Sequence, residues 1–259
     1  MKKRRFITIL ILIILWQSMA LLVDREILIP LPSHVFTQMF NDLSDPSFYY
    51  TIFTTLFRVI KGLLLAVSVS LIMGIIGGLY PKVSDYFSVI NDIIKSIPNI
   101  SYIIIILIWL GSESSVIIVS FFILFPTFYA NVLLAMNSLS KDLQDVMKVY
   151  PESLYHKLIK VYLPQTYPYL LSALKVGFGL GFKVSVMAEI LTQVQIGVGK
   201  QLSFDRNMLD MTGIFAWTIW IIIISLLVDR SFEQIIRHYT KNNWQGDQLF
   251  SFHDWYADW

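Results

Sequence analysis

Cysteine is absent from this chain of 259 residues, and charge is scarce, since Asp, Glu, Lys and Arg together make up 15% of it. The absence of cysteine excludes disulfides, thiolate metal ligands and thiol catalysis. A net charge of +2, with no basic patch interleaved with aromatic residues, argues against a nucleic-acid partner. The few histidines lie far apart, which argues against a zinc site. They are His34, His156, His238 and His253.

Hydrophobic residues are plentiful instead, at 56% of the chain. Charged residues make up about 25% of an ordinary soluble domain, well above the 15% found here. We therefore predict an all-α membrane protein with six transmembrane helices, which need about 120 residues at roughly 20 each. The first follows a basic cap and is expected to stay uncleaved, because its apolar run is longer than that of a signal peptide. The predicted spans cover residues 6–23, 51–80, 86–110, 115–136, 166–191 and 211–228.

Prolines punctuate the chain between and within these spans. Leu31-Pro32-Ser33 is typical of a helix start and predicts a short amphipathic helix that runs to Phe40, outside the membrane. Pro98 falls inside the third predicted span and is expected to kink it.

The distribution of basic residues predicts the orientation. With the N-terminus inside, the inner segments hold twelve Lys and Arg residues and the outer segments hold three, which satisfies the positive-inside rule. Both termini and the segment 141–164 are therefore predicted to face the cytoplasm. The inner residues are Lys2, Lys3, Arg4, Arg5, Lys82, Lys141, Lys148, Lys157, Lys160, Arg230, Arg237 and Lys241, and the outer ones are Arg25, Lys200 and Arg206.

The segment 141–164 is a long polar interruption between two apolar runs. Apolar residues recur at helical spacing in two stretches, 142–150 and 154–162, and Pro151 separates them. Because proline ends one helix and suits the first turn of the next, two short helices at an angle are expected. The apolar positions are Leu143, Val146, Met147 and Tyr150, then Leu154, Leu158, Val161 and Tyr162.

This segment resembles the EAA loop of permease subunits in binding-protein-dependent ABC importers. The family pattern is Glu-Ala-Ala, three residues, Gly, nine residues, Ile, one residue, Leu and Pro. Asp145-Val146-Met147 takes the first triplet, Pro151 stands at the glycine position, and Leu163-Pro164 closes the pattern. Further motifs resemble the nitrate, sulfonate and taurine branch over residues 6–240. They are Leu31-Pro32-Ser33, Thr55-Leu-Phe-Arg58 with Gly62, Ile97-Pro98 before Trp109-Leu-Gly111, and Met187-Ala-Glu189 before Gly197 and Gly199.

The resemblance implies the fold of a type I ABC importer permease, with a permease domain over residues 1–240, a cytoplasmic coupling loop at 141–164 and a cytoplasmic tail at 241–259. It also implies a homodimer in the cell membrane, two ATPase subunits and an extracytoplasmic solute-binding protein. The chain would bind no cofactor and would not be an enzyme, because ATP and Mg would be used by the ATPase. The expected ATPase-coupling residues are Asp145, Val146, Met147, Lys148, Tyr150, Pro151, Glu152, Leu163 and Pro164.

Charges within the predicted spans suggest the solute. Arg58, Lys61, Lys175 and Lys183 stand against a single acid, Glu189. Because a charge in the bilayer usually faces a cavity or a partner, this excess predicts a cationic translocation path and an anionic solute. The path residues are predicted to be Arg58, Lys61, Lys183 and Glu189. An ion pair between Glu189 and Arg58 is the alternative.

Two glycine-rich stretches do not indicate nucleotide binding. In the stretch around Gly197-Val-Gly199-Lys200-Gln201, Val194 and Gln201 occupy the positions of a glycine and a Ser or Thr in a phosphate loop. Gly177, Gly179 and Gly181 lie within a predicted span, where close helix packing is expected.

The sequence leaves three functional alternatives open. The same importer class could carry a vitamin precursor such as a pyrimidine, the chain could be an ion-coupled secondary carrier, or it could be a vitamin-binding membrane module. The aromatic and acidic tail could contact the ATPase, lie on the membrane surface, or fray.

Overall fold

The computed structural model describes residues 2–150 and 152–243. All regular elements in these ranges are helices, which confirms the all-α prediction. Pro151 and most of the tail, residues 244–259, lie outside the described residues, so the predictions made for them stay predictions. The elements are α1 (Lys2–Val23), α2 (Pro32–Asp42), α3 (Pro46–Leu79), α4 (Pro81–Ser96), α5 (Asn99–Asn137), α6 (Lys141–Val149), α7 (Leu154–Lys157), the π-helix η1 (Leu158–Tyr162), α8 (Leu163–Thr192), α9 (Val198–Met208) and α10 (Met211–Asn243).

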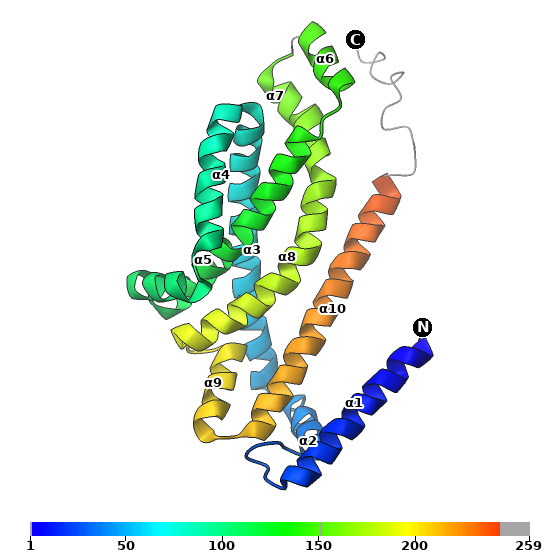
Figure 1. Ribbon diagram of the computed structural model, residues 1–259, viewed down its shortest axis with the longest axis vertical. Coiled ribbons are helices and arrows are strands. Elements are labelled where there is room, and N and C mark those ends of the chain that lie inside the picture. The colour runs from blue at the N-terminus through cyan, green and yellow to red at the C-terminus, as the bar shows by residue number, and fades with distance from the viewer. Residues whose placement is uncertain (1, 151, 244–259) are drawn as a thin grey trace.

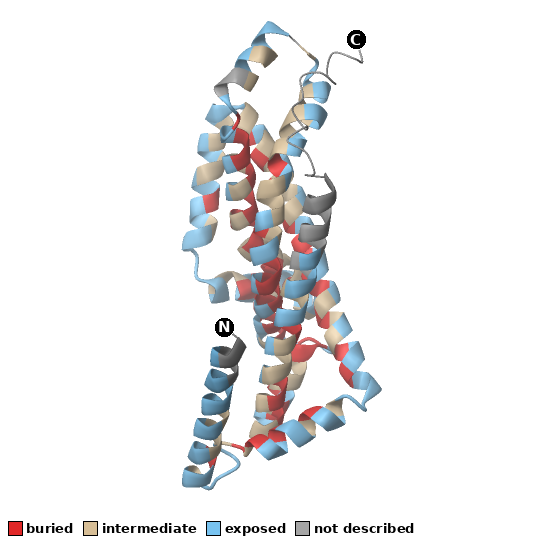
Figure 2. Ribbon diagram, turned by 90° about the vertical axis from the view of Figure 1, so that its right-hand side faces the viewer, coloured by how far each residue is buried: buried red, intermediate tan, exposed pale blue. Residues whose placement is uncertain are grey.

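The core of the molecule is a bundle of α3, α5 and α8 (Figure 1). Helices α6 and α7 lie at one end of this bundle, and α2 and α9 lie at the other. Buried residues follow the bundle along its length, whereas α1 is exposed along most of its own (Figure 2). Trp16 anchors α1 by stacking on Phe215 of α10, with 5.5 Å between ring centroids.

Small residues allow the three bundle helices to approach closely. A Cβ atom added at Gly62 of α3 would lie 2.6 Å from Cβ of Ser120 in α5, and one at Gly177 of α8 would lie 2.7 Å from the Phe128 ring. The packing role predicted for Gly177 is thus confirmed. The hydroxyls of Ser120 and Ser185 also share a buried hydrogen bond of 2.8 Å between α5 and α8. Such close contacts between small residues are typical of helix association in lipid. Lipid tails are as apolar as the side chains, so burial of apolar surface does little to drive the helices together.

Caps and prolines set the helix boundaries. Asp45 caps α3 by accepting a 2.8 Å hydrogen bond from the Ser47 amide, and hydrogen bonds from Ser47 hold the pKa of Asp45 below its usual value. Helix α4 begins at Pro81, because proline suits a first helical turn. The predicted helix from Leu31 to Phe40 is confirmed as α2, which also has proline at its start.

The prediction that 86–110 forms one kinked helix is wrong. Helix α4 ends at Ser96, before Pro98, and a separate helix begins at Asn99. Proline disfavours the helical conformation of the preceding residue, and Ile97 is extended with ψ of 128°. The change of direction within a helix occurs instead at Gly111, whose φ of 72° and ψ of 176° are accessible almost only to glycine.

The second short helix of the predicted coupling segment does not end at Leu163-Pro164. Helix α7, η1 and α8 follow one another without a break from Leu154 to Thr192. The π-helical turn explains how the chain continues through Pro164, which lacks an N–H and would clash with the carbonyl four residues earlier. The Leu163 amide bonds to the Leu158 carbonyl, five residues back, which widens the turn before the proline.

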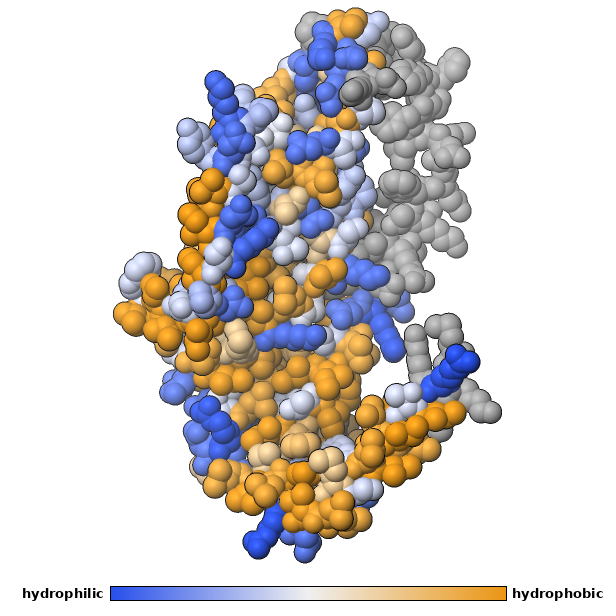
Figure 3. Space-filling model, in the orientation of Figure 1, coloured by the Kyte–Doolittle hydropathy of each residue, from blue (hydrophilic) through white to orange (hydrophobic). Residues whose placement is uncertain are grey.

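Four helical stretches in the described ranges are long and apolar enough to cross a membrane. Residues Ile7–Val23 of α1 form a shorter apolar helix, and α4, with 16 residues, would extend about 24 Å against a hydrocarbon core of about 30 Å. The surface in Figure 3 is mainly apolar in its lower half and more polar toward α6 and α7. Six crossings therefore stay a prediction. The four stretches are Pro46–Leu79, Asn99–Asn137, Leu154–Thr192 and Met211–Ser231.

Candidate functional site

Two of the predicted path residues form a buried ion pair in the middle of the bundle. Arg58 of α3 and Glu189 of α8 are 6% and 0% exposed, and Arg58 Nη1 lies 2.6 Å from Glu189 Oε1. The second oxygen of Glu189, Oε2, accepts hydrogen bonds of 3.0 Å from the Thr55 hydroxyl and from the Gly199 amide. The ion pair considered as an alternative from the sequence is confirmed.

A third charged group, Glu113, completes this cluster and was not predicted. Glu113 lies just after the Gly111 kink, and its Oε2 pairs with Nη2 of Arg58. Its other oxygen accepts a 3.1 Å hydrogen bond from the Gln195 amide. Two signals in the sequence could have singled out Glu113: it is close to Gly111, and it is an acidic residue within an apolar region. The cluster therefore holds one guanidinium against two carboxylates.

The cluster ties the connection between α8 and α9 to the bundle. Arg58 Nη1 donates a 2.7 Å hydrogen bond to the Ile196 carbonyl, and the Val198 amide donates one of 2.9 Å to the Thr55 hydroxyl. Gly199 is required for this contact, because an added Cβ would lie 2.5 Å from Cβ of Glu189 and 2.6 Å from the Val186 carbonyl oxygen. The network thus joins α3, α5, α8 and α9 at one point.

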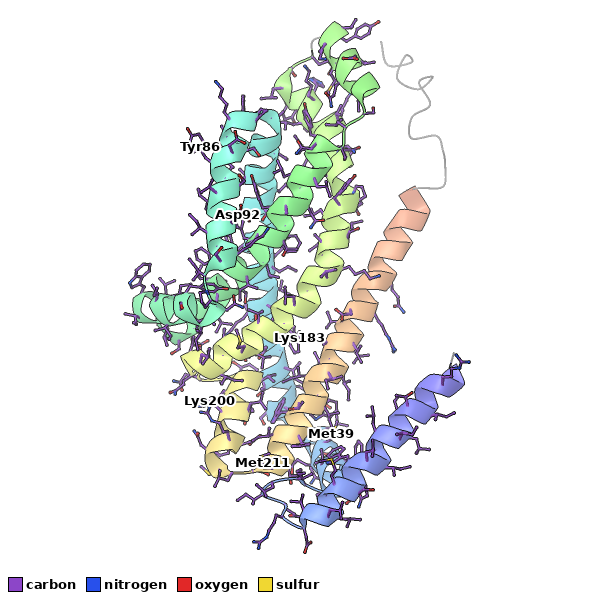
Figure 4. All side chains as sticks on the ribbon, viewed as in Figure 1. Met39, Tyr86, Asp92, Lys183, Lys200 and Met211 are labelled. Carbon is purple, nitrogen blue, oxygen red and sulfur yellow. The ribbon has the colours of Figure 1, made fainter. Side chains whose placement is uncertain are left out.

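The other two predicted path residues do not join this cluster. Lys61 is exposed, and its Nζ lies 4.2 Å from the centroid of the Phe57 ring. This distance is typical of a cation–π interaction. Lys183 is exposed on α8, between the α6–α7 end and α9 (Figure 4). The structure therefore separates the four residues into a neutralised buried pair and two exposed cations.

The predicted coupling segment forms the end of the molecule at α6 and α7. Ser140 caps α6 by accepting a hydrogen bond of 3.3 Å from the Leu143 amide, and Ser153 caps α7. Lys148 and Asp145 form an ion pair of 2.7 Å on the exposed surface of α6. Such exposed pairs contribute little stability, so both side chains can exchange this contact for one with a partner.

The apolar face of α6 is partly covered within the chain. Val146 and Met147 are half-buried, and Lys157 Nζ donates a 3.4 Å hydrogen bond to the Met147 carbonyl. More strongly exposed are Val149 at 71% and Tyr155 at 69%, which were not among the predicted coupling residues. The exposed apolar surface therefore centres on the bend between α6 and α7.

The remaining predicted coupling residues surround this bend or follow it. Tyr150 is exposed and Glu152 is half-buried, while Pro151 between them lies outside the described residues. Leu163 and Pro164 are exposed but belong to the start of α8 rather than to the bend. Of the eight described residues of the set, the structure thus places six on or beside α6 and the bend, and two at the start of α8.

Comparison with known proteins identifies the family. Residues 66–241 match the family described as binding-protein-dependent transport system inner membrane component. The chain belongs to this family. The permease is similar to the taurine transport system permease protein of Escherichia coli (strain K12), at 24% identity over 93% of this chain and 89% of that protein. It is also similar to the nitrate import permease protein of Synechocystis sp. (strain PCC 6803), at 26% identity over 88% and 85%.

A solved structure of the MetNI methionine ABC transporter in inward-facing conformations contains the same fold. The match has a TM-score of 0.62 at 17% identity and covers 74% of this chain and 95% of that one. The permease therefore has the fold of a type I ABC importer permease and is a multi-pass membrane protein. The family implies that it works with an ATPase and a solute-binding protein.

Proposed function

We propose that two copies of this permease form the translocation path of an ATP-driven importer for a small anionic solute. The permeases similar to it transport taurine and nitrate. Taurine ends in a sulfonate and nitrate is itself an oxyanion, so a negatively charged group bearing three oxygens is common to both. The observation in this chain that carries the proposal is Lys183, an exposed cation with no hydrogen bond or ion pair to another described residue.

The position of Lys183 favours a path over a lipid contact. It lies nine residues before Thr192, which ends α8, so it is about 14 Å along the helix axis from that end. A lysine facing lipid near the bilayer centre costs about 2.5–3.5 kcal/mol, so such residues face a cavity or a partner. The exposed face of α8 around Lys183 is otherwise apolar and includes Leu180 and Met187. A lone cation on such a face suits an anion that crosses between two permease copies.

Lys183→Met is expected to reduce uptake about tenfold at limiting solute, because it removes a charged hydrogen-bond donor worth about 1.5–3 kcal/mol. The measurement is uptake of radiolabelled taurine or nitrate by proteoliposomes that contain the complete importer. Basal ATP hydrolysis is expected to stay unchanged, since α8 is altered away from α6 and α7.

The matched control is Lys200→Met, the same substitution on α9 and outside the predicted path (Figure 4). It is expected to leave uptake at the wild-type level. Equal uptake by the Lys183→Met and wild-type importers at limiting solute would remove Lys183 from the path.

The coupling part of the proposal places α6 and α7 in a groove of each of two ATPase subunits, with this end of the molecule and both termini in the cytoplasm. Basic residues in this segment support the orientation, as the positive-inside rule requires. A short helix with exposed apolar residues at its end, such as Val149, suits a helix-in-groove contact. The permease itself is expected to bind no cofactor and to catalyse no reaction, because the ATPase holds ATP and Mg.

Asp145→Arg is expected to abolish co-purification of the ATPase. Within the chain the change replaces an exposed ion pair with Lys148 by a like-charge pair, which costs about 0.5 kcal/mol and leaves α6 folded. At a docking surface the same reversal opposes a charge on the partner and costs several kcal/mol. The measurement is the amount of ATPase that elutes with affinity-tagged permease in detergent.

Glu26→Arg reverses a charge at the opposite end of the molecule, where Glu26 contacts His34, and serves as the control. It should retain the ATPase. If both variants retained the ATPase equally, α6 would not be the docking helix.

A further inference from the structure

A cavity of about 190 Å³ opens at the end of the molecule opposite α6 and α7. It lies among α2, the start of α3, α9 and the start of α10, in the part of the molecule where Figure 4 labels Met39 of α2 and Met211 of α10. Since a water molecule takes up about 30 Å³ in the liquid, the space holds roughly six waters or one long side chain. Its walls combine four carboxylates with aromatic rings. The lining includes Asp42, Asp45, Asp205, Asp210, Phe204 and Trp217, and we call this site the acidic pocket.

Three of the four carboxylates already have partners. Asp42 accepts hydrogen bonds of 3.1 Å from Trp220 Nε1 and 2.8 Å from Gln38 Nε2. Asp45 caps α3, and Asp210 accepts a 3.1 Å hydrogen bond from the Gly213 amide. These contacts commit the three groups to holding the fold.

Asp205 of α9 differs from the other three. It is 9% exposed, and its buried Oδ2 has no hydrogen-bond partner among the described residues. A Cβ added at Gly213 would lie 2.7 Å from Oδ2 of Asp205 and 3.0 Å from Oδ2 of Asp210, so the two carboxylates converge on one point of the pocket. Burial, and then the charges of Asp210 and Asp42, raise the pKa of Asp205 to about 6. Asp205 is therefore an uncompensated carboxylate that a cationic group would satisfy.

The walls of the pocket indicate an organic cation rather than a metal ion. No group of three or more His, Cys, Asp or Glu side chains in the described part of the chain could hold a metal ion. The rings of Phe204 and Trp217 line the same space. Aromatic faces attract cations and pack against the apolar stems of lysine and arginine. A basic side chain would thus satisfy both the carboxylate and the rings.

We propose that the acidic pocket receives a lysine or arginine side chain of the solute-binding protein. The inference rests on the proposed function, which places this end of the permease outside the membrane and supplies the partner. A protein side chain that enters from outside meets both the unpartnered carboxylate and the aromatic rings that line the pocket. Each of the two permease copies would offer one such pocket, so the binding protein would be positioned by its basic residues.

Asp205→Asn is expected to raise the Kd of the binding protein about tenfold, because a charge-assisted hydrogen bond is lost from a buried site. The experiment measures the Kd of the purified binding protein of the same transporter for the permease–ATPase complex in nanodiscs, at low and high NaCl. The Kd of the wild-type complex should rise with salt more steeply than that of the variant. Thermal stability of the variant at pH 8 should equal or exceed that of the wild type, because the change removes repulsion from Asp210 and Asp42.

The control is Asp24→Asn, the same charge change in the connection after α1. Asp24 is exposed and has φ of 47°, a conformation that asparagine also adopts readily. The binding protein should therefore bind the Asp24→Asn complex with the Kd of the wild type. An equal Kd for Asp205→Asn and wild type would overturn the proposal that the pocket receives a basic side chain. Loss of wild-type binding on addition of EDTA would also overturn it, because that result would indicate a metal ion. Failure of the wild-type permease to co-purify with an ATPase would instead contradict the proposed function itself.

Discussion

Glu189→Gln is expected to lower the free energy of unfolding of the permease by about 3 kcal/mol. Removing one partner of a buried ion pair costs about 3–5 kcal/mol, because the remaining charge stays buried without compensation. Here Arg58 keeps a contact with Glu113, which places the effect at the lower end of that range. The change also weakens the acceptor of the Thr55 and Gly199 hydrogen bonds. The measurement is unfolding of the purified permease in detergent, together with the amount of folded protein in membranes.

Glu113→Gln provides the matched control, since Glu113 contacts the same arginine but its side chain is 51% exposed. Its loss should cost about 1 kcal/mol or less, as for partly exposed ion pairs. The double variant Arg58→Met, Glu189→Met should cost less than the sum of its single changes, because no buried charge remains. Equal stability losses for Glu189→Gln and Glu113→Gln would mean that the buried pair does not hold the bundle.

Gly199→Ala is expected to destabilise the permease by about 3 kcal/mol and to abolish uptake. The new Cβ would lie 2.6 Å from the Val186 carbonyl oxygen and 2.8 Å from the Ile190 amide nitrogen. Both are backbone atoms of α8, so no side-chain rotation relieves the overlap, and overpacking of this kind costs about 1–3 kcal/mol. Moving α9 away would also break the hydrogen bond from the Gly199 amide to Glu189. Thermal unfolding and uptake by proteoliposomes measure the two effects.

Lys200→Ala changes the next residue along α9 and tests whether the effect belongs to the position of Gly199. Lys200 is half-buried and no ion pair ties it to another described residue, so its loss should change stability by about 0.5 kcal/mol or less. Wild-type stability and uptake in the Gly199→Ala variant would show that α9 can shift without consequence.

Local features of the sequence predicted those parts of the fold that depend on neighbouring residues. The capped or proline-started helices α2 and α6 fall where the spacing of apolar residues placed them, because helix starts and amphipathic faces are local properties. Two prolines show where local features stop being sufficient: the prediction failed at Pro98, and the continuation of the helix through Pro164 was not predicted. Proline breaks the chain into two helices at the first and is absorbed by a π-helical turn at the second. Which response occurs depends on what packs against each segment, and this is not encoded nearby.

The charged residues show the same division. Lone charges in apolar segments were visible in the sequence, and the pairing of Arg58 with Glu189 could be named as one alternative. The participation of Glu113 and the unpartnered state of Asp205 could not be predicted, because their neighbours come from helices far away in the chain.

The sequence by itself determined that this is an all-helical membrane protein with a polar segment at 141–164, since composition and periodicity are sums over local residues. Its likeness to importer permeases likewise followed from motifs along the chain. Only the tertiary structure decided which charges neutralise each other and which remain available. Contacts between residues 131 positions apart, such as Arg58 and Glu189, exist only after the bundle has packed. The exposed Lys183 and the buried, unpartnered Asp205 owe their proposed roles to that packing, which supplies partners to the other charges around them.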